Sequence, residues 1–352
     1  MRLGLSLGYT GARVSFPIEL VKLAERLGYD SVWTAEAYGS DAMTPLAWIA
    51  AQTSRIRLGT GIAQLAGRTP AMCAMQAMTI DGLAGGGRMI VGLGVSGPQI
   101  VEGWYGQPWG TPYYRVRDYV QIMQKIFRRE GPVSHQGREI SLPYTGEGAT
   151  GLGKPLHSIV HQDAPIPIYL GSGADAMLRL AGQYCDGVLP LRFVPREMPR
   201  FRRAIEEGFA RAGTGKSWDT FCFEPGAGVT VTDDVASALA AHKPGIALYV
   251  GGMGHPTVNF HKRAMEQQGY ADAAARIEEL FRAGRKQEAA DAVPDEFVDE
   301  AALVGTPRRI RERYRAWAEA GITALHIGTR QAAALELMAE IALTDEPASV
   351  AR

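Results

Sequence analysis

Short apolar segments alternate with stretches of helical periodicity along the whole chain, and this alternation constrains the fold more than any other feature. The segments are residues 2–9, 30–35, 56–63, 88–94, 166–171, 186–191, a stretch that ends at 229–232, and 322–327. Several of them are continuous apolar runs, such as MIVGL and GVLPL. Such runs are typical of parallel strands that are buried on both faces.

Eight strand–helix units predict an α/β protein with a (β/α)8 TIM barrel, because a doubly wound sheet usually has fewer strands. We expect one domain over residues 1–352. Two connections are longer than normal: residues 131–165, after the fourth helix, contain a predicted hairpin, and residues 251–300 follow strand seven. Long insertions usually serve as lids, binding loops or subunit contacts.

Charge, hydropathy and cysteine content exclude several classes of protein. Lys+Arg and Asp+Glu both number 37, so the formal net charge is zero and nucleic acid is not an expected partner. No apolar run reaches the roughly 18 residues of a membrane helix. The three cysteines are far apart and no paired histidines lie beside a glutamate on a helix, so we expect no disulfide, no metal and a cytoplasmic location.

Glycine recurs where the predicted strands end. The chain has 42 glycines, and they punctuate segments 8–11, 59–64, 92–97 and 171–174. Barrel enzymes place their site at the carboxyl ends of the strands, and glycine lets a ligand approach the backbone closely. The sequence therefore predicts a ligand site at this rim.

Two of these segments resemble phosphate-binding motifs. Residues 92–97 (GLGVSG) match G-x-G-x-x-G, but the motif needs a helix to begin at once and we expect none until about residue 115. A dinucleotide site of the Rossmann type is therefore not predicted. Residues 171–174 (GSGA) open a helix directly, which suits either an anion site or an ordinary turn.

Candidate acids and bases at the rim are few. Glu36 follows the second strand closely and suits either a proton donor or a partner in a rim salt bridge. Tyr9, Tyr38 and Tyr113 are the alternatives for proton transfer. The aromatic loop over 97–114 offers Trp104, Tyr105 and Trp109, which either wall a substrate pocket or pack the loop.

Three stretches carry a family resemblance. They are LAERLGYDSVWTAEAYGSDAMTPLAWIAAQTSRIRLGTGIAQL, RMIVGLGVSGPQIVEGWYGQPWG and ALVGTPRRIRERYRAWAEAGITALHIG. The chain resembles the luciferase-like monooxygenase superfamily, and within it the branch of coenzyme F420-dependent oxidoreductases. The resemblance spans nearly the whole chain and implies a cofactor bound at the barrel mouth.

The resemblance also implies particular contacts to the cofactor. It implies a cis peptide bond at Gly61–Ile62 that backs the cofactor ring, and a phosphate grip at the turn after strand five. The full implied cofactor set is Gly61, Ile62, Gln64, Gly94, Val95, Ser96, Gly97, Gly171, Ser172, Gly173 and Ala174.

This chain departs from the family pattern at two points. Relatives commonly carry Gly-Pro where Ala174 and Asp175 stand, and an acidic Asp175 opposes an anion. Well-studied relatives carry a histidine behind strand two and a glutamate behind strand four, where this chain has Glu36 and Gly97. A different acid, or a different substrate, is therefore expected.

The expected activity is hydride transfer between F420 and an unidentified small organic substrate. Glu36 and Tyr9 are the predicted catalytic residues, and the predicted substrate pocket consists of Tyr38, Trp104 and Tyr113. An FMN-dependent monooxygenase on the same barrel and a non-catalytic ligand-binding relative are the alternatives. A homodimer is expected by analogy with the fold.

Overall fold

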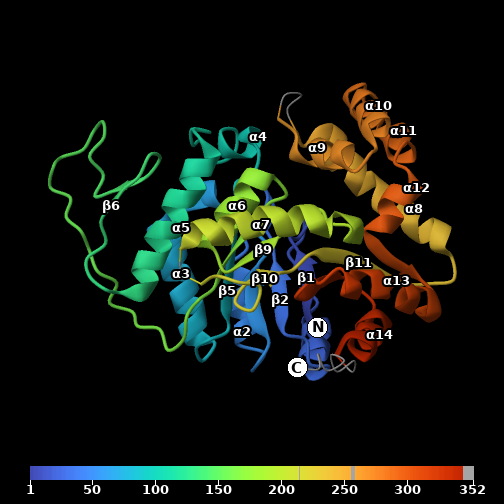
Figure 1. The fold of residues 1–352 in the computed structure, drawn as a ribbon, viewed down its shortest axis with the longest axis horizontal. Helices are drawn as coiled ribbons and strands as arrows, with labels where there is room; N and C mark the ends of the chain where they lie inside the picture. Colours follow the sequence, from blue (N-terminus) through green and yellow to red (C-terminus); the bar gives the residue numbers. More distant parts are fainter. Residues whose placement is uncertain (214, 255–257, 344–352) are drawn as a thin grey trace.

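The computed structural model describes residues 1–213, 215–254 and 258–343, and has an α/β architecture built on one large parallel sheet (Figure 1). The sheet strands are β1 (Arg2–Gly8), β2 (Ser31–Thr34), β3 (Arg57–Thr60), β4 (Ala63–Gln64), β5 (Met89–Gly94), β8 (Ile168–Gly171), β9 (Gly187–Leu189), β10 (Cys222–Phe223), β11 (Gly226–Val231), β12 (Ala302–Gly305) and β13 (Ala324–Gly328).

The helices between these strands follow the predicted periodicity. They are α1 (Ile18–Arg26), α2 (Thr44–Ala50), α3 (Pro70–Leu83), α4 (Pro98–Val101), α5 (Pro112–Arg128), α6 (Asp175–Tyr184), α7 (Met198–Ala212), α8 (Val235–Ala247), the π-helical turn η3 (Leu248–Gly252), α9 (Phe260–Gln267), α10 (Ala271–Arg282), α11 (Lys286–Asp291), α12 (Asp295–Glu300), α13 (Pro307–Glu319) and α14 (Ala332–Leu343), with short 3₁₀ turns η1 (Leu65–Gly67) and η2 (Pro195–Glu197).

The sheet curls round on itself. Its strand order is β10-β9-β8-β5-β3-β2-β1-β13-β11-β12, with β4 beside β5. Only Glu224 and Pro225 separate β10, which pairs with β9, from β11, which pairs with β13. The amide of Thr323 also donates to the Phe223 carbonyl at 3.2 Å. The segment 222–231 thus connects both sides of the strand order, as in TIM-barrel-like folds.

Four sequence-based predictions of secondary structure need correction. The seventh strand was expected as one stretch that ends at 229–232, whereas two strands are present: β10 begins at Cys222 and β11 at Gly226, and between them lies Pro225, which has no amide to donate. β12 was missed because ALVG continues an alanine-rich helical stretch. Residues 56–63 form two strands instead of one. The expectation of no helix before residue 115 was wrong, since α4 begins at Pro98 and α5 at Pro112.

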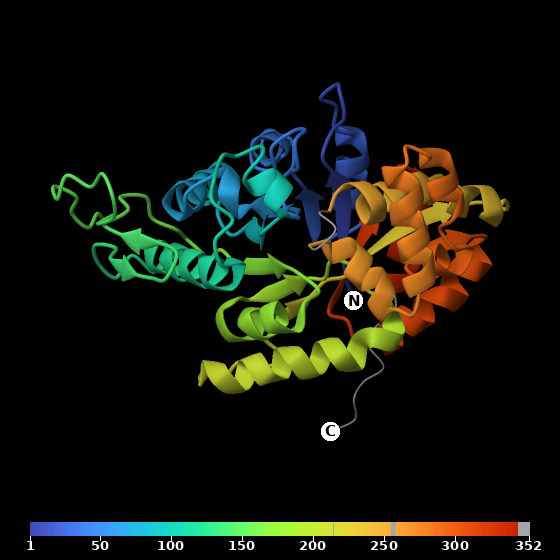
Figure 2. The same ribbon diagram turned by 90° about the horizontal axis from the view of Figure 1, so that it is seen from above.

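Both long insertions are visible as separate features. The predicted hairpin is present as β6 (His135–Gln136) and β7 (Ser141–Leu142), and its segment projects away from the sheet in both views (Figures 1 and 2). In the second insertion, α9 to α12 pack with α8 around a core of their own. Residues 255–257 of that insertion lie outside the described residues. None of the described helices combines the length and apolarity needed to cross a membrane.

Candidate active site

Three predicted cofactor segments meet at the side chain of Ile62. The peptide bond between Gly61 and Ile62 is cis, as the resemblance implied. A Cβ atom on Gly94 would lie 2.6 Å from Ile62 Cδ1, and a Cβ on Gly171 would lie 2.6 Å from Ile62 Cγ2. No larger residue fits at either position without displacing Ile62. The rim after β3, the end of β5 and the end of β8 therefore form one continuous surface.

The loop after β5 has an unusual backbone. Ser96 has φ of 61°, a left-handed conformation that non-glycine residues seldom adopt. Val95, Ser96 and Gly97 are all partly exposed, next to the junction at Ile62. Non-glycine residues in this region cluster at ligand-binding sites, so the backbone here supports the prediction of a binding loop.

An arginine that sequence reasoning missed lies beside the turn after β8. Arg200 of α7 donates to the Gly173 carbonyl at 3.1 Å and pairs with the Asp175 carboxylate at 2.5 Å. Asp175, expected to repel an anion, is thus neutralised by Arg200. With α6 beginning at Asp175, its N-terminal amides and Arg200 together suit an anionic group beside Gly171, Ser172, Gly173 and Ala174.

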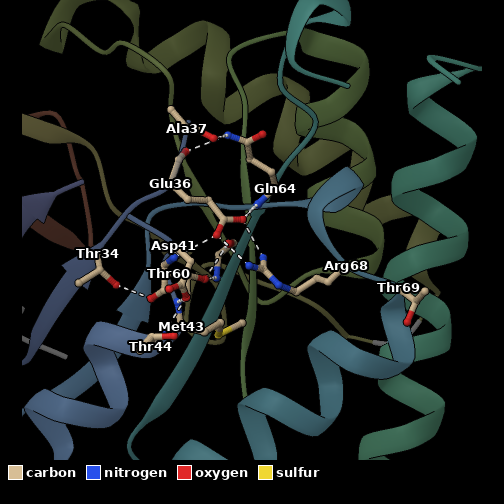
Figure 3. Close-up of polar contacts among 12 residues, drawn as sticks. Thr34, Glu36, Ala37, Asp41, Met43, Thr44, Thr60, Gln64, Arg68 and Thr69 are labelled. Carbon is tan, nitrogen blue, oxygen red and sulfur yellow. Dashed lines mark hydrogen bonds and ion pairs between the residues drawn. The ribbon is translucent and has the colours of Figure 1, made fainter. Parts of the chain in front are cut away.

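Glu36 lies at the centre of a dense polar network at the rim (Figure 3). Its two carboxylate oxygens accept from Arg68 at 2.7 and 2.8 Å. They also accept from the backbone amides of Gln64 at 2.6 Å and Ala42 at 3.0 Å. The Gln64 side chain donates in turn to the carbonyl of Glu36 at 2.9 Å. Four donors thus hold one carboxylate that is 3% exposed.

This occupancy argues against the predicted role of Glu36 as proton donor. Each oxygen of this buried carboxylate already accepts from one arginine nitrogen and one backbone amide, so both oxygens are occupied by contacts within the fold. The network instead fixes the loop after β2 to β4 and to the segment that carries Arg68. We infer that Glu36 is a positioning residue, which is the salt-bridge alternative that the sequence left open.

Tyr9 contacts the second insertion. Its hydroxyl lies 3.0 Å from the Tyr249 hydroxyl of η3. Burial, together with the hydrogen bond to Tyr9, raises the pKa of Tyr249, so this phenol stays protonated at neutral pH. Gln99 of α4 also donates to the Met253 carbonyl at 3.1 Å, and α4 and α9 lie on the same side of the sheet (Figure 1). η3 therefore borders the rim near Tyr9.

The predicted substrate-pocket residues lie in different environments. Tyr38 is 49% exposed and donates to the Met253 sulfur at 3.5 Å, so it borders η3. Trp104 is 63% exposed just after α4. Tyr113 is half-buried in the first turn of α5, with its ring 5.4 Å from that of Tyr114. Of the three, Tyr38 has a described contact with the segment over the rim.

Sequence reasoning missed the residues that fill the inside of the curled sheet. The ring of Trp33 stacks on that of His326 with centroids 5.5 Å apart. A Cβ on Gly59 would lie 2.2 Å from the Trp33 ring, so glycine is required there. Burial lowers the pKa of His326 to about 4. A histidine in the apolar run ALHIG was the signal that could have identified this position.

Glu224 lies beneath these rings and was also missed. Burial and the nearby charge of Asp30 raise its pKa to about 7. Its Oε1 atom is buried with no hydrogen-bond partner in the described part of the chain. Two rim atoms share that state, Thr10 Oγ1 and Gln64 Oε1. Buried polar atoms normally have hydrogen-bond partners, so each of these two atoms could accept a hydrogen bond from a bound polar group.

Across residues 1–213, 215–254 and 258–343, no group of three or more His, Cys, Asp or Glu side chains is arranged to hold a metal ion. All three cysteines are free and buried.

Known proteins match this chain over most of its length. A family model described as luciferase-like monooxygenase matches residues 1–324. A Mycobacterium tuberculosis protein with the provisional name coenzyme F420-dependent oxidoreductase is 49% identical, over 92% of this chain and 93% of its own. The 5,10-methylenetetrahydromethanopterin reductase of Archaeoglobus fulgidus is 30% identical, over 88% of each chain.

A solved structure has a similar fold. The coenzyme F420-dependent tetrahydromethanopterin reductase of Methanopyrus kandleri superposes with a TM-score of 0.77 at 25% identity. The match covers 97% of this chain and 98% of that one.

Proposed function

Because this chain belongs to the luciferase-like monooxygenase family, we propose that it is a coenzyme F420-dependent oxidoreductase acting on a small organic substrate. The observation that carries the proposal is the junction at Ile62, where the cis peptide, the end of β5 and the end of β8 form one surface. The names of the mycobacterial relative and of the Methanopyrus structure support F420 over FMN. We further propose that the curled sheet is a (β/α)8 barrel.

The residues at the rim suit the parts of F420. The Gly61–Ile62 peptide and the Val95–Gly97 backbone would hold the ring, with Thr10 Oγ1 and Gln64 Oε1 as polar partners near it. The turn at Gly171–Ala174, with Arg200 beside it, would hold the phosphate. When bound and reduced, F420 supplies a hydride from C5 of its deazaflavin ring.

The chain's own residues position the reactants and hold a proton. Reduction of a carbonyl carbon requires a proton as well as a hydride. Tyr9 is our proposed donor, and the Tyr249 hydroxyl at 3.0 Å holds the Tyr9 hydroxyl in position. Glu36 and Arg68 hold the neighbouring loop in place, and Tyr38 borders the substrate.

A fluorescence titration tests the cofactor assignment. The protein is added to F420, and separately to FMN, and binding is followed by the change in cofactor fluorescence. We expect saturable binding of F420 and weak binding of FMN. Tight binding of reduced FMN together with oxygen uptake would favour the monooxygenase. Binding of reduced F420 without its oxidation by any ketone, enone or iminium compound would favour a non-catalytic relative.

A homodimer is a further proposal, supported by exposed apolar side chains on α2 and α3. Trp48, Met72, Met75 and Leu83 are 46%, 47%, 57% and 70% exposed. Trp48 lies on α2 and the other three on α3, and these two helices contact each other. Exposed apolar side chains favour contact with another protein surface. We expect sedimentation equilibrium to give twice the chain mass, and Met75→Glu to shift it toward the monomer. A wild-type monomer at micromolar concentration would contradict this.

A further inference from the structure

A cavity of about 320 Å³ lies between the sheet and the helices of the second insertion. It is bounded by the loop after β9, by β11, and by α8, η3, α9 and α12. Its lining includes Leu191, Arg192, Gly228, His242, Tyr249 and His261. The volume is at the lower end of the range of about 300–1,000 Å³ for small-molecule sites.

The cavity borders the proposed active site at two points. Tyr249 lines the cavity and its hydroxyl contacts that of Tyr9 at the rim. Leu191 also lines it, and its Cβ would lie 3.8 Å from a Cβ placed on Gly173 of the proposed phosphate turn. A ligand in the cavity is thus flanked by the proposed proton donor and by the proposed cofactor site.

Two imidazoles line the cavity without hydrogen-bond partners among the described residues. The His261 ring lies 4.6 Å from the Tyr249 ring, centroid to centroid. The His242 ring lies against Gly228, where a Cβ would be 3.1 Å from its Cε1. Burial lowers the pKa of both, to about 4 for His261, so both rings are neutral at pH 7. A neutral imidazole offers one donor and one acceptor.

One positive charge borders the cavity. Arg192 is the charged side chain among its described lining residues. Its guanidinium donates to the Gln268 side chain at 2.6 Å and to the Phe297 carbonyl, and stacks on the Phe297 ring at 3.5 Å. These contacts hold the Arg192 side chain in place, so the two imidazoles are the lining groups whose hydrogen-bonding atoms have no partner in the described part of the chain.

We propose that this cavity binds a mostly apolar ligand that carries one hydrogen-bonding oxygen, a carbonyl or hydroxyl, recognised by His242 and His261. That this ligand is the substrate of the hydride transfer rests on the proposed function. The selectivity of the cavity does not, since it follows from the lining residues alone.

Two probes of matched shape test the selectivity: 1-indanone and indane. Each is titrated into the full chain without F420, and binding is measured by ligand-observed NMR. We expect 1-indanone to bind about fivefold more tightly than indane, the gain from one net hydrogen bond. Indane that binds as tightly as 1-indanone overturns the proposal.

Variants assign the binding to this cavity. Ala264→Phe places a ring in the cavity, and the control Ala275→Phe makes the same change on the exposed face of α10. We expect Ala264→Phe to weaken 1-indanone binding at least tenfold, and Ala275→Phe to leave it unchanged. His242→Leu with His261→Leu should reduce the preference for ketone over indane to about one. The assignment is refuted if Ala264→Phe and Ala275→Phe bind 1-indanone equally well. It is also refuted if the double leucine variant keeps the preference for 1-indanone over indane.

Thermal melting of each variant checks that it is folded, and the F420 titration is run in parallel. If the chain does not bind F420 but still prefers 1-indanone to indane, the proposed function is wrong and the cavity proposal stands. If the chain binds F420 but shows no preference for 1-indanone, only the cavity proposal is wrong.

Discussion

Substitution of Glu36 by glutamine separates a positioning role from a catalytic one. Glutamine keeps one acceptor oxygen for Gln64 N and Arg68 Nη1. Its NH₂ group, however, replaces the oxygen that accepts from Ala42 N and Arg68 Nη2. Two hydrogen bonds become contacts between donors, and the Arg68 guanidinium keeps its charge without a partner.

The cost follows from the burial of this pair. The Glu36 and Arg68 side chains are 3% and 10% exposed, so solvent screens their interaction little. Breaking a buried pair costs about 3–5 kcal/mol, and two lost hydrogen bonds to charged groups give a similar sum. At about 2 °C for each kcal/mol, the lower figure lowers the melting temperature by about 6 °C.

Thermal melting followed by circular dichroism is the assay, with Glu207→Gln as the matched control. Glu207 pairs with Arg179 at 3.2 Å, with side chains 44% and 29% exposed, so its loss should cost less than about 1 kcal/mol. Replacing both partners, Glu36→Gln with Arg68→Met, should recover part of the stability because no buried charge remains. A Glu36→Gln melting temperature equal to that of the control would refute the positioning role.

Three further predictions follow from single contacts. Glu224 has a pKa of about 7 against an ordinary value of 4.5, so the folded state binds more protons and stability falls as pH rises through this window. Glu224→Gln should therefore gain up to about 3 kcal/mol over wild type between pH 5 and 8, and a constant difference in melting temperature would contradict this. Gly171→Ala should cost about 1–3 kcal/mol by contact with Ile62, and a double variant with Ile62→Ala should be at least 1 kcal/mol more stable than additivity predicts. Asp175→Asn frees Arg200 and should lower the Kd for F420 about threefold in low salt, whereas an unchanged Kd would remove the anion from this turn.

The positions of most strands along the chain were predictable from the sequence, because burial on both faces dictates continuous apolar runs. The exceptions have local causes. Segment 222–231 carries Glu224 and Pro225 in its middle, and both are unusual within a buried strand. The short helix α4 begins at Pro98, directly after Gly97. Proline favours the first position of a helix, but the many glycines nearby made this segment resemble a loop.

The site was predictable as a set of segments but not as a set of interactions. Arg200 lies 25 residues from Asp175 in sequence, and nothing in either local pattern indicates that they pair. Glu36 and Arg68 are likewise 32 residues apart. Long-range ion pairs depend on how helices pack. The sequence therefore identified the carboxylates but not the arginines that pair with them.

The rim glycines show how one feature can have two physical causes. They suggested open backbone for a ligand, yet Gly94 and Gly171 accommodate Ile62, and Gly59 accommodates Trp33. A few large side chains therefore shape the floor and wall of the proposed ring site, and the glycines are the spaces that receive them. Because Ile62 also belongs to the cis peptide, enlarging either glycine must displace the same residue that would back the ring. Enlarging Gly94 or Gly171 is thus expected to change both the stability of the fold and the affinity for the cofactor. Substitution of Glu36, in contrast, is expected to act mainly on stability.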